Sequence, residues 1–274
     1  MRERQVNRNT VVLMAMLFSM VLFFVPAFGK APSAENLLID MGNLDAGYLK
    51  AKYTGECEKA SIAFTKENGT GIAMELTDKW LNYTFTLGSG TYKVWLYEFD
   101  EGGKKTICYK TKISVKLENE YDMFRYSNCY VDVENTTVQA VAKVIKENSE
   151  SDIERILKVE KFVSDWLIYD EVKKNDIVEN DTQIYLVDMD QLFKSRKGVY
   201  YDYAVMAMAL LRAQDISARM VFGFTGNVQY HAWVEAYLKD TDQWVRIDPT
   251  YAESLEDPRE YISDDTNYVA VKYY

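Results

Sequence analysis

The sequence predicts an α+β protein in which an N-terminal β-sandwich precedes helices packed on an antiparallel sheet. Short strand-like runs separated by turn residues fill the region from about residue 35 to 120. Helical periodicity begins beyond residue 133, and three more strand-like runs follow it. With 274 residues, of which 48% are hydrophobic, the chain is long enough to bury the cores of two domains.

The first region contains strand-like runs at residues 48–54, 59–65, 71–77, 82–88, 91–99 and 105–117. Turns rich in Gly, Asn or Asp, such as ENGTG and DEGGKK, separate these runs. About seven strands at this spacing predict a small β-sandwich of the immunoglobulin or fibronectin type. The predicted domain covers residues 30–125.

The second region, residues 126–274, begins with helical patterns at residues 138–150 and 151–174. Ser151 is placed to cap the second helix, and Glu154 would complete a capping box. A further helix, apolar on most faces and therefore buried, is predicted from about Tyr200 to Gln214. Three strand-like segments predict an antiparallel sheet; they lie at residues 217–224, 228–238 and 243–248. The boundary between the two domains falls near residues 118 to 133.

The N-terminus has the pattern of a secretory signal peptide over residues 1–29. Three arginines within the first eight residues precede an apolar run, and the small-residue pattern Ala-Phe-Gly follows. An uncleaved membrane anchor is the alternative, because the apolar stretch reaches about the lower length limit for crossing a bilayer. We therefore expect a secreted or cell-envelope protein on the extracytoplasmic side.

Composition limits the partners of this protein. The formal net charge is −10 and no cluster of Lys and Arg is present, which argues against nucleic acid or anionic lipid. A peptide, a protein or a cell-envelope polymer remains as the expected partner. The chain has a single histidine and no Cys/His cluster, so a zinc site has almost no ligands. The sequence thus predicts no metal and no cofactor.

Three cysteines in a chain predicted to be exported permit one disulfide and leave one thiol. Cys57 and Cys108 are the favoured pair because both lie in the strand-rich region, and such a bridge would stabilise the fold by about 4 kcal/mol. Three separate buried thiols, including Cys129, are the alternative.

One helix start in the second region looks suited to presenting a side chain. Gly198 allows a sharp turn, and the helix that follows presents its unpaired N–H groups at Tyr200. Such a position favours an anion.

A histidine and an aspartate are expected to meet on the predicted sheet. By strand alternation, His231, Trp233 and Glu235 share one face. A four-residue hairpin loop would place Asp248 opposite Trp233 and diagonal to His231. A carboxylate there can hold the tautomer and orientation of an imidazole, as in nucleophile–base–orienter catalysis.

The stretches KGVYYDYA, LLRAQDISARMVFGF, YHAWVEAYL and QWVRIDPTY resemble the core of the transglutaminase-like superfamily, which shares the papain-like cysteine catalytic arrangement. The resemblance covers roughly residues 184 to 251, and the helices from about 136 to 174 fit its preceding part. It implies a cysteine nucleophile at a helix start, a histidine base and an orienting aspartate. His231 and Asp248 match the last two, whereas Tyr200 stands where the cysteine should be.

This departure predicts loss of acyl transfer through a thioester. A thiol starts near pKa 8.5 and is readily ionised beside a helix N-terminus and an imidazolium, whereas a phenol starts near pKa 10 and is a far weaker acyl acceptor. The Tyr200 hydroxyl is predicted to donate a hydrogen bond to His231 and to fill the site. Cys129 and Ser195 are possible substitutes for the nucleophile, but neither follows from the motif.

Structural roles are the alternatives for these residues. A His–Asp pair on a strand can be a simple structural contact. Trp233 and Trp244 could line a peptide-binding cleft, although packing is the more common role of aromatic residues on a half-buried sheet.

Three functions are therefore open. The first is a secreted pseudoenzyme that binds peptide or envelope polymer in a vestigial cleft, with Tyr200, His231 and Asp248 in the former catalytic positions. The second is an active hydrolase or acyltransferase that works through Tyr200 or a displaced nucleophile. The third is a purely structural surface protein.

Overall fold

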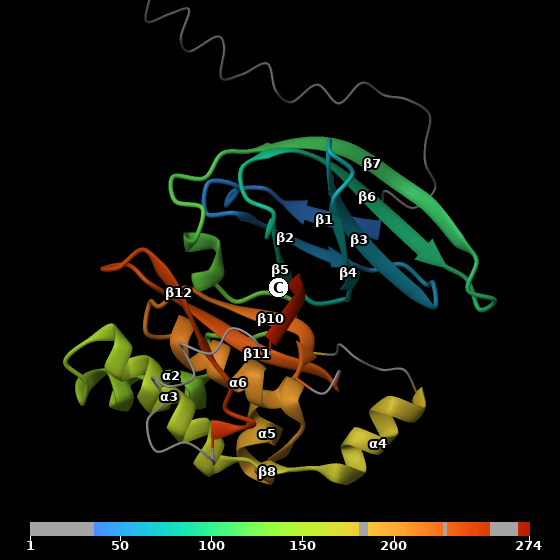
Figure 1. The fold of residues 1–274 in the computed structure, drawn as a ribbon. Helices are drawn as coiled ribbons and strands as arrows, with labels where there is room; N and C mark the ends of the chain where they lie inside the picture. The colour runs from blue at the N-terminus through green and yellow to red at the C-terminus, as the bar shows by residue number, and fades with distance from the viewer. Residues whose placement is uncertain (1–35, 181–185, 227–228, 253–267) are drawn as a thin grey trace, which may run out of the picture.

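The computed structural model describes residues 36–180, 186–226, 229–252 and 268–274. A β-sandwich and a helix-and-sheet part follow one another along the chain, which confirms the predicted α+β class (Figure 1). The predicted signal peptide lies outside the described residues. Within the described ranges, no helix combines the length and the apolar character that a membrane span requires.

Seven strands in two antiparallel sheets form the sandwich. One sheet has the order β1-β2-β5 and the other the order β4-β3-β6-β7. An immunoglobulin constant-type sandwich keeps its fourth strand in the sheet of strands one, two and five, whereas here β4 pairs with β3. The strands are β1 (Leu37–Asp40), β2 (Tyr48–Tyr53), β3 (Lys59–Lys66), β4 (Gly71–Leu76), β5 (Leu81–Thr84), β6 (Gly90–Phe99) and β7 (Lys105–Val115).

The sandwich core lies between the inner faces of the two sheets. Leu49 from β2 and Phe64 from β3 are fully buried, and Phe64 stacks on Phe85 with 4.4 Å between ring centroids. The outer face of the β1-β2-β5 sheet carries the alternate residues, among them Lys50 and Asn82, which lie opposite each other in the register. Lys50 and Asn82 on this outer face line a cavity together with residues of the linker and of the second part of the molecule.

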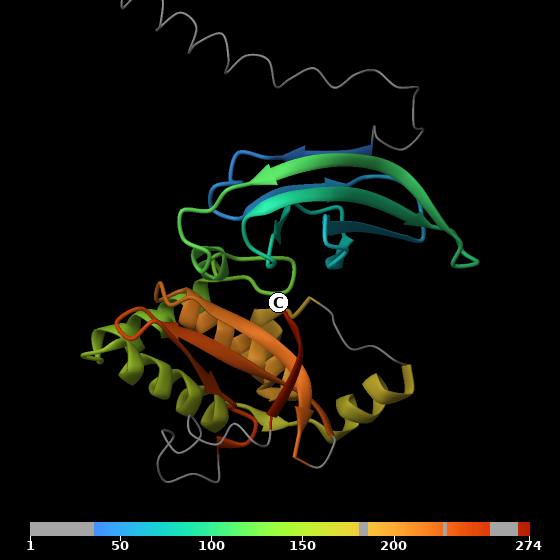
Figure 2. The same ribbon diagram turned by 45° about the horizontal axis from the view of Figure 1, so that its top comes forward.

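The second part places helices against a four-stranded antiparallel sheet of order β12-β11-β10-β13 (Figure 2). Its strands are β10 (Ala218–Thr225), β11 (Gln229–Leu238), β12 (Gln243–Ile247) and β13 (Tyr268–Tyr273), with a short parallel pair β8 (Ile168–Tyr169) and β9 (Lys197–Gly198). Its helices are α2 (Thr136–Glu147), α3 (Asp152–Trp166), α4 (Glu171–Asn180), α5 (Met189–Ser195) and α6 (Tyr200–Arg212). The sequence runs did not reveal β13, whose side chains are mostly exposed.

Helix α6 is the centre of this part. Its residues 201–212 are all buried, and it packs on the sheet strands β10 and β11 and on helices α2 and α3. The capping of α3 is confirmed in part. The Ser151 hydroxyl accepts the N–H of Glu154 at 3.3 Å, but the Glu154 carboxylate accepts the N–H of Glu150 instead of that of Ser151.

The linker between the two parts packs against the sheet and α6. A short 3-10 helix, η2 (Asp122–Arg125), brings Phe124 against Trp244 with 5.7 Å between ring centroids. The buried guanidinium of Arg212 donates to the carbonyl of Tyr126 at 2.8 Å. Trp244 is therefore a packing residue at the junction.

The favoured disulfide between Cys57 and Cys108 is not formed, and none of the three cysteines, all within the described residues, takes part in a disulfide. Strand β6 lies between β7, which carries Cys108, and β3, which follows Cys57. Cys108 is also the extra residue of a bulge, since Leu96 pairs with Tyr109 and Tyr97 with Ile107. The alternative expectation, three separate buried thiols, holds for Cys108 and Cys129, whereas Cys57 is only partly buried.

Candidate functional site

The start of α6 already contains an anion from the chain itself. The carboxylate of Asp202, in the first turn, accepts the N–H of Val199 at 2.8 Å and is fully buried. Lys173 from α4 forms an ion pair with this carboxylate at 2.8 Å. The anion that this helix N-terminus favours is thus the carboxylate of Asp202, and Lys173 balances the charge of that carboxylate.

Gly198 is required by a close approach and not by the sharp turn that the sequence suggested. A Cβ atom on Gly198 would lie 2.7 Å from the Cβ of Asp202. The left-handed residue of this segment is Arg196, with φ of 56°, which ends α5. Gly198 itself pairs with Tyr169 in the β8–β9 ladder, and this pairing fixes where Tyr200 begins the helix.

The predicted contact between His231 and Asp248 is confirmed. The imidazole Nε2 lies 2.8 Å from Asp248 Oδ2, and both side chains are buried. Val234 pairs with Ile247 in the β11–β12 hairpin, so the next position of this register sets Asp248 opposite Trp233, as expected from the loop length. The register of the β11–β12 hairpin alone thus brings His231 and Asp248 together.

Two further residues fix Asp248, and the sequence reasoning missed both. The Tyr268 hydroxyl from β13 donates to Asp248 Oδ2 at 3.0 Å. The carboxylate of Glu160 from α3 accepts the backbone N–H of Asp248 at 2.9 Å. A signal for Glu160 was present, because this acidic residue lies on the buried stripe of α3 with Ile156, Val159 and Val163.

Burial changes the ionisation of Glu160. Loss of solvation, together with the nearby charge of Asp248, raises its pKa from 4.5 to about 7, although the N–H of Asp248 opposes this rise. Glu160 is therefore a buried carboxyl that titrates near neutral pH. It accepts the backbone N–H of Asp248, whose side chain in turn contacts His231.

Tyr200 lies beside His231 at the start of α6. The two rings are 5.5 Å apart between centroids and tilted by 54°. This ring contact, and not the predicted hydrogen bond, joins the two side chains within the described part of the chain. Burial, with a smaller effect from Tyr230, raises the pKa of the Tyr200 phenol above its ordinary value of 10. The phenol consequently stays protonated at neutral pH.

The two substitute nucleophiles lie elsewhere. Burial raises the pKa of the Cys129 thiol to about 12, which is opposite to what a nucleophile needs. Ser195 lies at the end of α5, where its hydroxyl donates to the carbonyl of Leu192 and accepts the N–H of Lys197. Neither side chain joins the His231 site.

The remaining candidates have structural roles. Trp233 is only 1% exposed and packs edge-on against Tyr268 with 5.0 Å between ring centroids, so it supports the site from within the core.

Among the described residues, no group of three or more His, Cys, Asp and Glu side chains could hold a metal ion. The absence of a metal or cofactor stays a prediction.

Comparisons with known proteins agree with the core built above. Residues 139–249 match the transglutaminase-like superfamily, and this span includes α3, α6 and the β10–β12 strands with Tyr200, His231 and Asp248. The stretch that resembled this superfamily in sequence is therefore identified as a transglutaminase-like core.

Individual relatives are distant. The chain is 24% identical over 206 residues to "Uncharacterized protein YebA" of Bacillus subtilis (strain 168); the match covers 68% of this chain and 25% of that protein. A candidate cysteine protease of Cytophaga hutchinsonii has 14% identity and a TM-score of 0.44, with 83% of each chain covered. The periplasmic domain of TgpA from Pseudomonas aeruginosa has 14% identity and a TM-score of 0.37, with 83% of this chain and 95% of that chain covered. This chain thus spans a quarter of the length of the Bacillus protein.

Proposed function

We propose that this protein is a secreted or cell-surface pseudoenzyme whose transglutaminase-like region binds peptide or a cell-envelope polymer without turning it over. The observation that carries this proposal is Tyr200, which stands at the start of α6 beside His231, where the family arrangement requires a cysteine. The pattern of residues 1–29 supports export, and the acidic charge of the chain disfavours nucleic acid as a partner.

The chemistry of the site supports the absence of turnover. A covalent acyl intermediate needs a nucleophile that is ionised or has a base within hydrogen-bonding reach. The Tyr200 phenol has a raised pKa and meets His231 through its ring. The buried Cys129 thiol, the alternative nucleophile, is less acidic than a free one.

The same site keeps features that suit binding. Tyr200, Tyr230 and Tyr251 are partly buried, and burial raises the pKa of each phenol, so all three keep a hydroxyl donor at neutral pH. Tyr251 also stacks on His231 with 4.7 Å between ring centroids. Half-buried aromatic rings with a polar end are common in recognition surfaces.

A paired assay tests this function. The purified chain and its Tyr200→Cys variant are incubated with a glutamine-containing peptide plus a fluorescent primary amine, and separately with a quenched peptide substrate. We expect no turnover by the natural chain. Saturable binding of the same peptide, or of purified cell-envelope polymer, would support the binding role, whereas its absence would favour a purely structural surface protein.

An active enzyme is the second candidate, and the intact His231–Asp248 contact is the observation that favours it. Such an enzyme would form an acyl-tyrosine at Tyr200 or use another nucleophile. Mass spectrometry of the chain after incubation with substrate distinguishes the two: an adduct at Tyr200, or catalytic turnover, would replace the pseudoenzyme proposal.

A further inference from the structure

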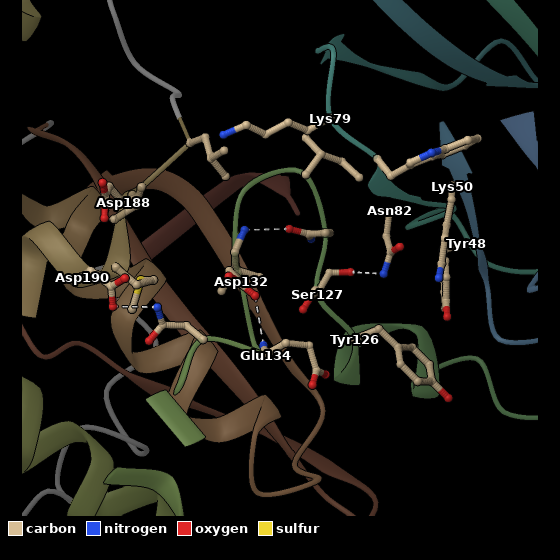
Figure 3. Close-up of a pocket in the computed structure, with 18 residues that line it drawn as sticks. Tyr48, Lys50, Lys79, Asn82, Tyr126, Ser127, Asp132, Glu134, Asp188 and Asp190 are labelled. Carbon is tan, nitrogen blue, oxygen red and sulfur yellow. Dashed lines mark hydrogen bonds between the residues drawn. The ribbon is translucent and has the colours of Figure 1, made fainter. Parts of the chain in front are cut away.

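A polar cavity of about 690 Å³ lies at the junction of the two parts of the molecule (Figure 3), and its lining includes neither Tyr200 nor His231. Its volume is in the range of small-ligand and peptide sites, which often lie between domains. One wall is the outer face of the β1-β2-β5 sheet, with Lys50 and Asn82. The opposite wall is formed by the linker, residues 126–135, and by the segment 186–190 at the start of α5.

The two walls carry opposite charges. Lys50 and Lys79 come from the sandwich, and four carboxylates come from the opposite wall; these are Asp132, Glu134, Asp188 and Asp190. None of these six charged groups forms an ion pair within the part of the chain that the structure describes. Figure 3 shows the Lys79 side chain extending from the sandwich toward the segment that carries Asp188. The cavity therefore separates charges that a ligand could pair.

A buried amide group provides an independent indication of a ligand. The Asn128 side chain is 5% exposed and lines the cavity. Its Oδ1 accepts the N–H groups of Tyr130 and Val131 at 2.9 and 3.1 Å, whereas its Nδ2 has no hydrogen-bond partner among the described residues. Because Nδ2 is not one of the fully enclosed side-chain atoms without a partner, it is open to solvent at the cavity wall, and a ligand carbonyl or carboxylate would accept its hydrogen bond in place of water.

Aromatic side chains complete the lining. Trp80 is 48% exposed, and the ammonium of Lys52 lies 5.5 Å from its ring centre. Tyr48 and Tyr126 line the cavity beside it. Such rings can stack on a guanidinium or on the aliphatic part of a side chain while the carboxylates pair with its charge.

We propose that this junction cavity binds an oligopeptide that carries both cationic and anionic groups. Its basic side chains pair with the acidic wall, its carboxylates with Lys50 and Lys79, and a backbone carbonyl with Asn128 Nδ2. Because the lining shares no residue with the Tyr200 site, this binding does not depend on whether that site is catalytically inactive.

The experiment measures binding of a fluorescein-labelled hexapeptide of alternating Lys and Glu to the full chain, by fluorescence anisotropy at low salt. Hexalysine, hexaglutamate and an N-acetylglucosamine tetramer, the last measured by calorimetry, are the comparison ligands. We expect saturable binding of the mixed-charge peptide, tighter than that of either single-charge peptide, and weaker at high salt because screening acts on exposed pairs.

Conservative variants locate the site. Asp188→Asn and Asp190→Asn keep a side-chain oxygen for their hydrogen bonds to Gln191 and Asn135 while they remove the charge. Lys79→Gln removes a charge from the other wall, and Asn128→Asp removes the free donor while it keeps the oxygen that orders the linker. Each variant should weaken binding by about 2- to 5-fold, as expected for a partly exposed pair.

Matched controls are exposed residues that do not line the cavity. Asp240→Asn, Lys110→Gln and Asn68→Asp make the same chemical changes outside the cavity lining and should leave the affinity unchanged. Thermal unfolding checks that every variant is folded. The proposal would be overturned if the mixed-charge peptide showed no saturable binding, or if only the saccharide bound. Equal affinities of the site variants and the control variants for the peptide would also overturn it. So would a combined result in which hexalysine binds as tightly as the mixed-charge peptide and Lys79→Gln leaves the affinity unchanged.

Discussion

The carboxylate of Glu160 accepts the backbone N–H of Asp248 at 2.9 Å, and so connects α3 to the strand end that orients His231. Asp248 has all its polar groups engaged, because its side chain also receives Tyr268 and the N–H of Thr250. A buried network of this kind keeps one arrangement only while every member is satisfied. Glu160 is the member whose charge changes near neutral pH.

The first prediction concerns the pH dependence of stability. The folded-state pKa of Glu160, about 7, lies above the ordinary value of 4.5, so the folded protein binds this proton more tightly than the unfolded chain. The stabilisation is complete below about pH 4.5 and is lost as the pH rises through 7. Raising the pH from 5 to 8 should therefore lower the free energy of unfolding by about 2 kcal/mol through the ionisation of this one group.

Urea unfolding of the natural chain and of Glu160→Gln at pH 5, 6, 7 and 8 measures this effect. The variant cannot ionise, so the difference in unfolding free energy between the two proteins should change in favour of the variant as the pH rises. Glu147→Gln, at an exposed position of α2, is the control and should show no such trend. A constant difference across the four pH values would mean that Glu160 keeps its ordinary pKa.

The second prediction concerns Asp248. Asp248→Ala would leave the Nε2–H of His231 and the hydroxyl of Tyr268 without their acceptor in a buried setting. Each unsatisfied group costs about 1–3 kcal/mol, so we expect a loss of about 3 kcal/mol in the free energy of unfolding. Asp240→Ala, in the exposed hairpin turn, should change it by less than about 0.5 kcal/mol. Chemical denaturation of the two variants makes the comparison, and similar losses would assign Asp248 no structural role.

Local patterns predicted much of this molecule. Strand alternation and the loop length between β11 and β12 were enough to bring His231 to Asp248, because a hairpin register follows from its turn. The strand runs of the sandwich and the buried helix α6 also followed from periodicity.

Contacts between elements distant in sequence were not predictable in this way. Glu160 and Tyr268 reach Asp248 from 88 and 20 residues away, and no local period encodes those distances. The cavity at the junction depends on how the sandwich and the linker meet. The need for glycine at position 198 likewise depends on the close approach of Asp202, whereas the local sequence suggests only a sharp turn there.

The third prediction concerns the independence of the second part. The sequence alone suggests that a chain beginning near Asn128 should fold, but such a chain lacks the Tyr126 carbonyl that accepts from Arg212 and the Phe124 ring that covers Trp244. We expect residues 119–274 to unfold cooperatively and residues 128–274 to be less stable by about 2 kcal/mol. Thermal unfolding of both chains measures this, and equal stability would show that the linker contacts contribute nothing.

The last prediction concerns the thiol of a Tyr200→Cys variant. Its sulfur would lie at the start of α6 near His231, and Lys173 balances the charge of Asp202 in the same turn. A thiolate there should be stabilised by the helix N-terminus and the imidazolium, so iodoacetamide should modify Cys at position 200 faster than it modifies the half-buried Cys57 near neutral pH. Peptide mapping by mass spectrometry gives both rates in the same sample. Adding His231→Gln should slow the reaction at position 200 toward that of an ordinary thiol and leave Cys57 unchanged. If the new thiol reacts slowly even with His231 present, the surroundings of Tyr200 do not activate a thiol at this position.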